Sequence, residues 1–383
     1  MKIKAIEPIA VSLPMKKPVQ MAGETVARAD NVLVRIEADN GAIGWGEAAS
    51  APTMTGETVA SMMAAVDHMA PGLRGRAADD FAGVATEMAA RMYGNTSAKA
   101  AIDMALYDLV GRVSQRPVHA LLGTKLRNSM PLLAIVGSED AAADLRDAEA
   151  RWAAGYRTFK VKVGLGTPQA DAERTRFVCT ALKRKGDCVV SSDANQGFTV
   201  DGALQYVRAL GNCGLDFFEQ PVEAHDLAGM MKIAEATPVA IGTDEGIHSL
   251  ADLEHHYARG VRGASLKAIK LGGLRAMLEA CRLCDRLGMN VNIACKTGES
   301  SIGSVAALHV AAVAPAVAWG LSLTSGGLAE DVVVTPLNFA GGNTDVPDVP
   351  GLGVEVDERR VRQSAQAFKR VAYTVRAALL ISR

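Results

Sequence analysis

The chain has 383 residues, of which 49% are apolar and 22% are charged, and its formal net charge is -1 at pH 7. This balanced composition is typical of a soluble globular protein, and it argues against nucleic acid or an anionic membrane surface as a partner. The N-terminal residues alternate charged and apolar side chains instead of forming a signal-peptide core, and no run of about 18 uncharged apolar residues follows. We therefore expect a cytoplasmic protein of two domains.

The first 125 residues predict an α+β domain. An alternating run, VLVRIEA, meets a DNG turn and a second strand, which is the pattern of an antiparallel hairpin. From residue 56 to residue 120 the pattern changes to long helices rich in Ala and Met, such as AIDMALYDL. Residues 1–125 are therefore expected to form one domain.

Residues 126–325 predict a barrel. Eight short apolar runs alternate with amphipathic helical segments in units of roughly 25 residues. So many βα units favour a closed (β/α) barrel over an open doubly wound sheet, and no G-x-G-x-x-G opens a helix. The turn-rich segment 326–383 is expected to return to the first domain. The expected strands are residues 132–136, 158–163, 188–193, 215–219, 239–244, 263–270, 289–294 and, weakly, 317–321.

Three consecutive strands end in an acidic residue: Asp193, Glu219 and Asp244. Active sites of such barrels form at the C-terminal ends of the strands. Neighbouring strands lie about 5 Å apart, so three carboxylates there would repel one another unless a cation joined them. Oxygen donors without His or Cys favour Mg²⁺. One such acid is as often a helix cap or a lysine partner, but three together predict a metal site.

Two further strands carry lysines. Lys160 and Lys162 alternate along the second strand and so share a face, while Lys267 lies across the barrel on the sixth strand, with Lys270 close behind it. Lysines buried near one another and near a metal resist being charged together, which is expected to lower the pKa of at least one. A lone strand lysine is usually a surface residue, but opposed lysines around three acids predict a general base.

Together these groups predict proton abstraction beside a substrate carboxylate. Removing that proton places a second negative charge on the carboxylate oxygens. Bound Mg²⁺ would stabilise the resulting enediolate while a lysine takes the proton.

The ordered motifs resemble the muconate lactonizing enzyme (muconate cycloisomerase) subgroup of the enolase superfamily. Any one motif alone would be weak, but five in order at one-unit spacing are specific. The resemblance implies a TIM-type barrel of the modified (β/α)7β kind, with an N-terminal α+β capping domain completed by the C-terminal segment. The motifs are KVK (160–162), DANQGF (193–198), FEQPV (218–222), TDEGIHS (243–249) and LKAIKLGG (266–273).

The resemblance also implies a ligand set. Asp193, Glu219 and Asp244 would bind Mg²⁺, for which Mn²⁺ can substitute. Three neighbours of these ligands would hold them in place from outside the metal shell. These neighbours are Asn195, Gln220 and Glu245.

By the same resemblance, Lys162 is the base on one face of the substrate. Lys160 would steady the substrate carboxylate beside it, and Lys267 would act on the opposite face. Lys270 is the rival for that second position, with contact to the substrate as its expected role.

The substrate itself is left open. The end of the eighth strand, residues 321–325, lacks the acid typical of muconate cycloisomerases and the D-x-D of dipeptide epimerases. The segment after the seventh strand lacks the histidine of the mandelate racemase subgroup. Lys296 and Glu299, in that segment, are expected at the substrate. Lys296 would bind a second anionic group there or form a salt bridge with Glu299 or another acid.

Two loops of the first domain, at about residues 19–25 and 51–55, would cover the pocket. Met21 and Met54 in these loops would form an apolar, adaptable lid in contact with the substrate, although plain packing explains such methionines equally well.

The leading hypothesis is a Mg²⁺-dependent cycloisomerase or racemase/epimerase acting on a small carboxylate. A syn-dehydratase of a hydroxylated acid or imino acid, such as a hydroxyproline, is the alternative. A non-catalytic binding barrel is a remote third hypothesis, because it predicts the loss of a ligand or lysine and none is lost. By resemblance, the protein is expected to be a homo-oligomer, either a dimer or an octamer.

Overall fold

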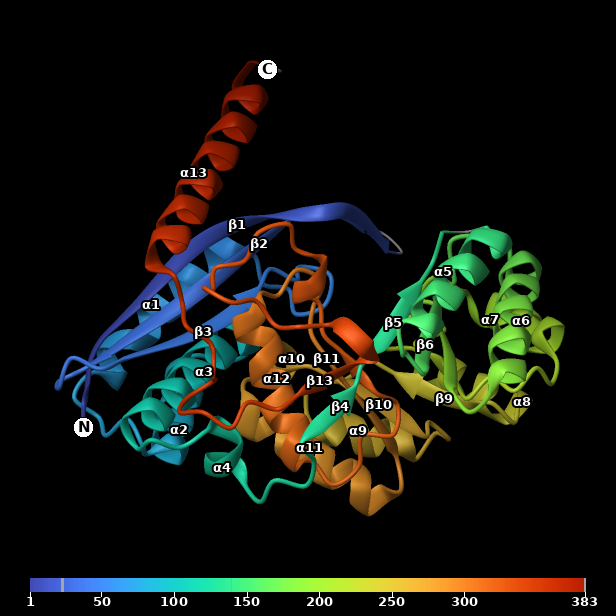
Figure 1. Cartoon of the computed structure of the whole chain (residues 1–383), viewed down its shortest axis with the longest axis horizontal. Coiled ribbons are helices and arrows are strands. Elements are labelled where there is room, and N and C mark those ends of the chain that lie inside the picture. Colours follow the sequence, from blue (N-terminus) through green and yellow to red (C-terminus); the bar gives the residue numbers. More distant parts are fainter. Residues whose placement is uncertain (22–23, 139, 382–383) are drawn as a thin grey trace.

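The computed structural model describes residues 1–21, 24–138 and 140–381, without the side chains of residues 20–24 and 371–381. The N-terminal part is a three-stranded antiparallel sheet covered by helices (Figure 1). The long helix α3 packs against β3, because Gly44 and Gly46 let its backbone approach closely; a methyl group at either glycine would overlap it. The elements are β1 (Ile3–Met21), β2 (Glu24–Ala38), β3 (Ile43–Ala49), α1 (Val59–Leu73), α2 (Phe81–Arg91), α3 (Thr96–Val113) and α4 (Val118–Leu122).

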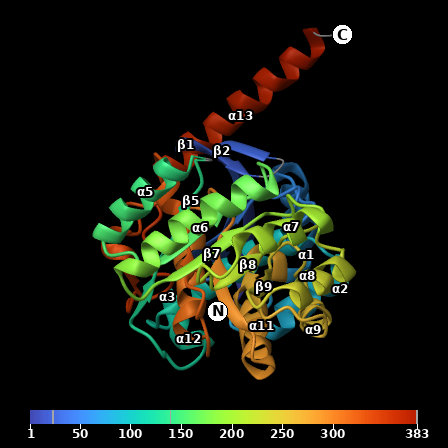
Figure 2. The same ribbon diagram turned by 90° about the vertical axis from the view of Figure 1, so that its right-hand side faces the viewer.

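The middle of the chain forms a nearly closed barrel of eight parallel strands in the order β12-β11-β10-β9-β8-β7-β6-β5. A bridge between Leu132 and Leu321 brings its two edges together. Figure 2 shows α5, α6, α7 and α8 following one another around the outside. The strands are β5 (Leu133–Val136), β6 (Thr158–Lys162), β7 (Val189–Asp193), β8 (Phe217–Glu219), β9 (Ala240–Thr243), β10 (Gly263–Leu266), β11 (Asn290–Ala294) and β12 (Leu321–Ser322).

The barrel helices begin at residues that suit helix N-termini. Thr167, Thr199 and Ser249 each accept a hydrogen bond from a backbone N–H in the first turn of α6, α7 and α9. The helices are α5 (Ala141–Ala153), α6 (Pro168–Lys185), α7 (Val200–Leu210), α8 (Leu227–Ala236), α9 (Leu250–Tyr257), α10 (Ala268–Leu271), α11 (Leu274–Leu287) and α12 (Ser301–Val313).

Two expected strands differ from the observed ones by more than two residues at one end. The sixth strand ends at Leu266, because Lys267 is the N-cap of the short helix α10. The eighth strand starts only at Leu321, because the chain turns at Gly320 with a positive φ of 81°. Before that turn, the Trp319 ring stacks on Phe217 with ring centroids 3.7 Å apart.

The C-terminal segment returns to the capping sheet. β13 (Asn343–Asp345) pairs with β4 (Ser129–Pro131), and α13 (Glu358–Ile381) contacts β1 before its far end leaves the body of the molecule (Figures 1 and 2). The predicted fold class is therefore confirmed. The division into residues 1–125, 126–325 and 326–383 stays a proposal. Within the described residues, no helix is long and apolar enough to span a membrane.

Candidate active site

The three expected metal ligands and the three expected catalytic lysines meet at one cavity, at the C-terminal end of the barrel. This is the end at which βα loops converge in barrels of this type. Asn195, Lys296 and Met54 also line the cavity, so the loop containing Met54 reaches it from the capping domain. The six residues are Lys160, Lys162, Asp193, Glu219, Asp244 and Lys267.

The strand register explains why the three acids meet. Asp193 stands opposite Glu219 on neighbouring parallel strands, and Asp244 directly follows the next strand, β9. All three are buried, with exposed fractions of 1%, 1% and 4%. Burying three carboxylates is costly unless positive charge compensates them.

Lysines provide that compensation. Lys160 donates to Glu219 Oε2 at 2.6 Å, and Lys162 donates to Asp193 Oδ2 at 2.5 Å and to Asn195 Oδ1 at 2.6 Å. Lys267 donates to both carboxylate oxygens of Asp244.

These contacts set the pKa values of the lysines. Burial by itself would lower the pKa of Lys160, but the charges of Glu219 and Asp193 outweigh it and raise that pKa. The pKa of Lys267 is likewise raised, because the charge of Asp244 outweighs burial. The pKa values of Lys160 and Lys267 are therefore raised and not lowered, whereas burial and the neighbouring Lys267 charge lower the pKa of Lys270 despite the charge of Asp244.

The donor set fits a hard divalent cation in its chemistry. Three carboxylates on neighbouring strand ends offer only oxygen, without His or Cys, as Mg²⁺ prefers. As placed, no three His, Cys, Asp or Glu side chains among the described residues converge on one metal position, because the carboxylate oxygens face the lysine ammonium groups.

Residues behind the acids hold them in place. Gln220 accepts from the Asp244 N–H at 2.9 Å, and the Asn195 N–H donates to Asp193 Oδ1 at 2.9 Å. Both hold positive φ angles, 38° and 41°, which are uncommon for residues with side chains and recur at functional sites. Asn195 also donates to Glu245 at 3.0 Å, and burial together with the Asp244 charge raises the pKa of Glu245 to about 7.

Two residues expected at the substrate, Lys270 and Glu299, are not among the described residues that line the cavity. Lys270 is fully buried behind Asp244, where its ammonium donates to Asp244 Oδ1 at 2.6 Å and to the Ser265 carbonyl at 2.9 Å. Glu299 accepts from the Lys296 backbone N–H at 3.1 Å, and burial and the Glu47 charge raise its pKa to about 7. The Met21 side chain lies outside the described residues.

The cavity also contains residues that the sequence reasoning missed. Ile135 and Thr297 line it. Ser322 and Thr324 also line it, although their segment was noted only for containing no acidic residue. Ile135 and Ser322 lie at or near the ends of barrel strands, so applying the strand-end rule to apolar and hydroxyl residues would have found them.

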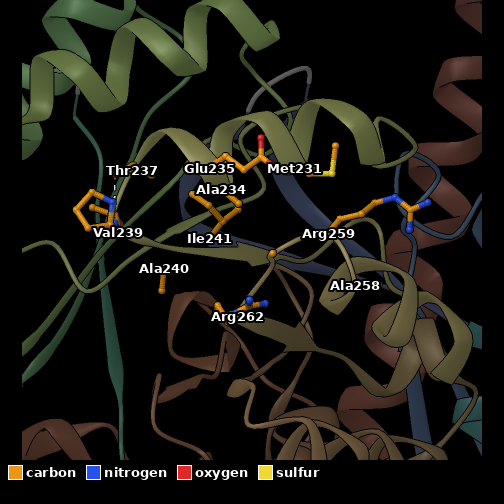
Figure 3. Close-up of a pocket in the computed structure, with 12 residues that line it drawn as sticks. Met231, Ala234, Glu235, Thr237, Val239, Ala240, Ile241, Ala258, Arg259 and Arg262 are labelled. Atoms are coloured by element: carbon orange, nitrogen blue, oxygen red, sulfur yellow. Dashed lines mark hydrogen bonds between the residues drawn. The ribbon is translucent and has the colours of Figure 1, made fainter.

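A second cavity at the opposite end of the barrel is larger, about 410 Å³ against about 60 Å³. Its size alone would rank it above the cavity at the C-terminal strand ends. However, it lies at the N-terminal ends of the strands, where barrel residues serve stability. Its charged side chains, Glu235, Arg259 and Arg262, do not point toward a common centre (Figure 3). We therefore take the cavity at the C-terminal end of the barrel as the candidate active site.

Two family models match the chain: "Mandelate racemase / muconate lactonizing enzyme, N-terminal domain" over residues 5–123 and "Enolase C-terminal domain-like" over residues 143–360. A chloromuconate cycloisomerase of Cupriavidus necator is 32% identical, covering 96% of this chain and 100% of that protein. An L-Ala-D/L-Glu epimerase of Bacillus subtilis is also 32% identical, with 92% of this chain and 97% of that protein covered.

Among solved structures, the muconate lactonizing enzyme of Pseudomonas fluorescens, complexed with muconolactone, superimposes with a TM-score of 0.89 at 29% identity. The match covers 95% of this chain and 99% of that one. Models of both domains, relatives of full length and a solved structure thus agree. The chain belongs to the mandelate racemase/muconate lactonizing enzyme family of the enolase superfamily.

Proposed function

We propose that the protein removes the proton beside a substrate carboxylate with a lysine base and Mg²⁺, and that it works as a cycloisomerase or as a racemase/epimerase. A lysine or histidine base with Mg²⁺ is the known solution of the enolase superfamily, so this proposal follows the family. Members typically use a divalent metal, and the curated relatives are isomerases.

The observation that carries the proposal is the placement of two lysines. Lys162 ends β6 and Lys267 directly follows β10, four places apart in the eight-stranded order, so they face each other across the barrel. Both line the cavity on either side of the acids. A substrate between them would present opposite faces to the two ammonium groups, so a proton could leave on one face and return on the other.

Asp193, Glu219 and Asp244 would hold the cation, and Gln220 and Asn195 would keep them in position. When bound, the cation would neutralise the second negative charge that develops on the substrate carboxylate. Lys160, already held by Glu219, would steady that carboxylate. If Asp193 and Asp244 held the cation, Lys162 and Lys267 would lose their ion pairs with these carboxylates and would be available to exchange protons with the substrate.

The charges around the cavity favour a substrate with two anionic groups. Four lysines and three carboxylates line it. With one lysine neutral as the base, the remaining lysines balance the carboxylates, and a divalent cation leaves two positive charges. Lys296, from the loop after β11, would meet the second anionic group.

The test is hydrogen exchange in D₂O, followed by NMR, with Mg²⁺ and a panel of N-acyl amino acids, dipeptides, proline derivatives and muconates. Lys162→Ala and Lys267→Ala probe the two faces, and Lys185→Ala, on the barrel exterior, is the matched control. For the saturated acids we expect metal-dependent loss of the α-proton, and for the muconates we expect uptake of deuterium at the carbon beside a carboxylate as the lactone forms. Lys185→Ala should retain this activity, and at least one of the two site variants should abolish it. Exchange that survives both site variants, or that proceeds equally in a chelator, would refute the proposal.

The same experiment separates isomerisation from the syn-dehydration alternative. A product with inverted configuration, or a lactone, is expected for an isomerase. Loss of a substrate hydroxyl with formation of a double bond would instead identify a dehydratase.

A further inference from the structure

One hydrogen bond ties the capping domain to the loop that carries Asp244. His248 Nε2 lies 2.7 Å from the carbonyl oxygen of Met54, 194 residues away in the sequence. Met54 belongs to the loop of residues 51–55, and it lines the cavity. Within the described residues, no other barrel residue makes a hydrogen bond to this loop.

The remaining hydrogen bonds of the loop come from its own domain. The Met54 and Thr55 N–H groups both donate to the Ala51 carbonyl, and the Thr55 hydroxyl accepts from Ser97 at 3.1 Å. These bonds shape the loop as a turn but do not attach it to the barrel. Among the hydrogen bonds of the described residues, the His248 contact is the one that joins the turn to the barrel, in addition to the apolar packing of Met54.

The backbone of His248 is held in place by its own contacts. Its backbone N–H donates to Asp252 Oδ2 at 2.9 Å, in the first turn of α9, and the neighbouring Ile247 is fully buried. The ring therefore starts from a fixed backbone, only four residues after Asp244. Because this backbone is held in place, less conformational entropy is lost when the ring stays hydrogen-bonded to the Met54 carbonyl.

The acceptor in this bond decides which ring nitrogen must carry a hydrogen. A carbonyl oxygen only accepts, so Nε2 must carry the hydrogen. Both the neutral ring with its proton on Nε2 and the protonated ring offer that donor. The contact therefore survives changes in pH that titrate the imidazole.

We propose that His248 is a positioning residue that latches the loop of residues 51–55 over the cavity and thereby sets the affinity for substrate. The latch is a contact within the free protein. Its effect on affinity rests on the proposed function, because it requires that the cavity is where substrate binds.

The latch is tested first by amide hydrogen exchange of the peptide containing residues 51–57, without substrate. In His248→Asn, whose amide nitrogen falls near the position of Nδ1, we expect exchange of the Met54 and Thr55 amides to rise on the order of fivefold, the factor corresponding to one net hydrogen bond. His248→Gln places an amide nitrogen near Nε2, so it should restore exchange to within about twofold of the wild type. His255→Asn, on the exposed face of α9, is the matched control.

The kinetic arm uses whichever acid of the D₂O panel reacts. His248→Asn should raise KM on the order of fivefold with kcat nearly unchanged, and His248→Gln should recover most of that loss. A general loss of structure would instead lower kcat and would not be rescued by glutamine. Wild-type exchange at residues 51–57 in His248→Asn, or an unchanged KM, would overturn the proposal. Because the exchange measurement needs no substrate, its result is independent of whether the proposed reaction is correct.

Discussion

Replacing Glu47 with alanine should destabilise the junction between the capping sheet and the barrel. The buried Glu47 carboxylate accepts from the Ser300 N–H at 2.9 Å, from the Ser300 hydroxyl at 2.6 Å and from the Gly303 N–H at 3.0 Å. It thus caps the N-terminus of α12 from another part of the chain. Asn31 also donates to it at 2.6 Å, but Asn31 keeps a second acceptor in the Gly298 carbonyl.

The size of the effect follows from the groups left without an acceptor. Three buried donors lose Glu47, and each costs about 1 kcal/mol or more when unpaired. Burial raises the pKa of Glu47, so removing its charge recovers part of that cost. We expect a net loss of about 3 kcal/mol in the free energy of unfolding. With an unfolding entropy of roughly 2 cal/mol/K per residue, this corresponds to a decrease in Tm of roughly 4 °C.

Urea denaturation followed by circular dichroism measures this loss. Glu7→Ala, on the exposed side of β1, is the matched control and should change stability by less than about 0.5 kcal/mol. Glu47→Gln keeps one acceptor oxygen and should fall between the two. If Glu47→Ala were as stable as the control, the hydrogen bonds of the Glu47 carboxylate would not contribute to stability, contrary to this prediction.

Two further perturbations test the packing and the buried charge. Burial raises the pKa of Asp103, which accepts from the Leu274 N–H at 2.7 Å, to about 7. The folded state therefore holds this proton up to higher pH than the unfolded state, so its contribution to stability, present at pH 4, is lost as the pH rises through 7. Relative to Asp103→Asn, the free energy of unfolding of the wild type should decrease by up to about 4 kcal/mol between pH 4 and pH 8, as measured by urea unfolding. A difference between the two proteins that stays constant with pH would contradict the raised pKa of Asp103. Gly263→Ala should cost about 1–3 kcal/mol, because the added methyl would overlap the Trp319 ring, whereas Gly123→Ala, which meets only ordinary contacts, should not; equal thermal midpoints for the two variants would show that the ring can move aside.

Much of the site could be predicted from the sequence, because strand ends converge in a parallel barrel whatever the details of its packing. That rule alone places Asp193, Glu219 and Asp244 on one rim. Lys267 also lines the cavity, although its strand ends one residue earlier.

Other features depend on contacts that no local pattern encodes. The local sequence around Glu47 does not show that its partner is Ser300, 253 residues away. The lysine pKa values depend on whether an ammonium group meets a carboxylate or another ammonium group, which only the folded geometry decides. The position of Lys270 behind Asp244 follows from α10 starting directly after β10, and a four-residue helix gives too weak a periodic signal to predict.

The central claim is that two lysines act on opposite faces of one substrate. The most direct test uses the separate enantiomers of a reactive acid, each incubated with Mg²⁺ in D₂O. We predict that Lys162→Ala abolishes α-proton exchange from one enantiomer and leaves it in the other, and that Lys267→Ala shows the reverse. Loss of exchange from the same enantiomer in both variants would contradict the claim, because it would place both lysines on one face.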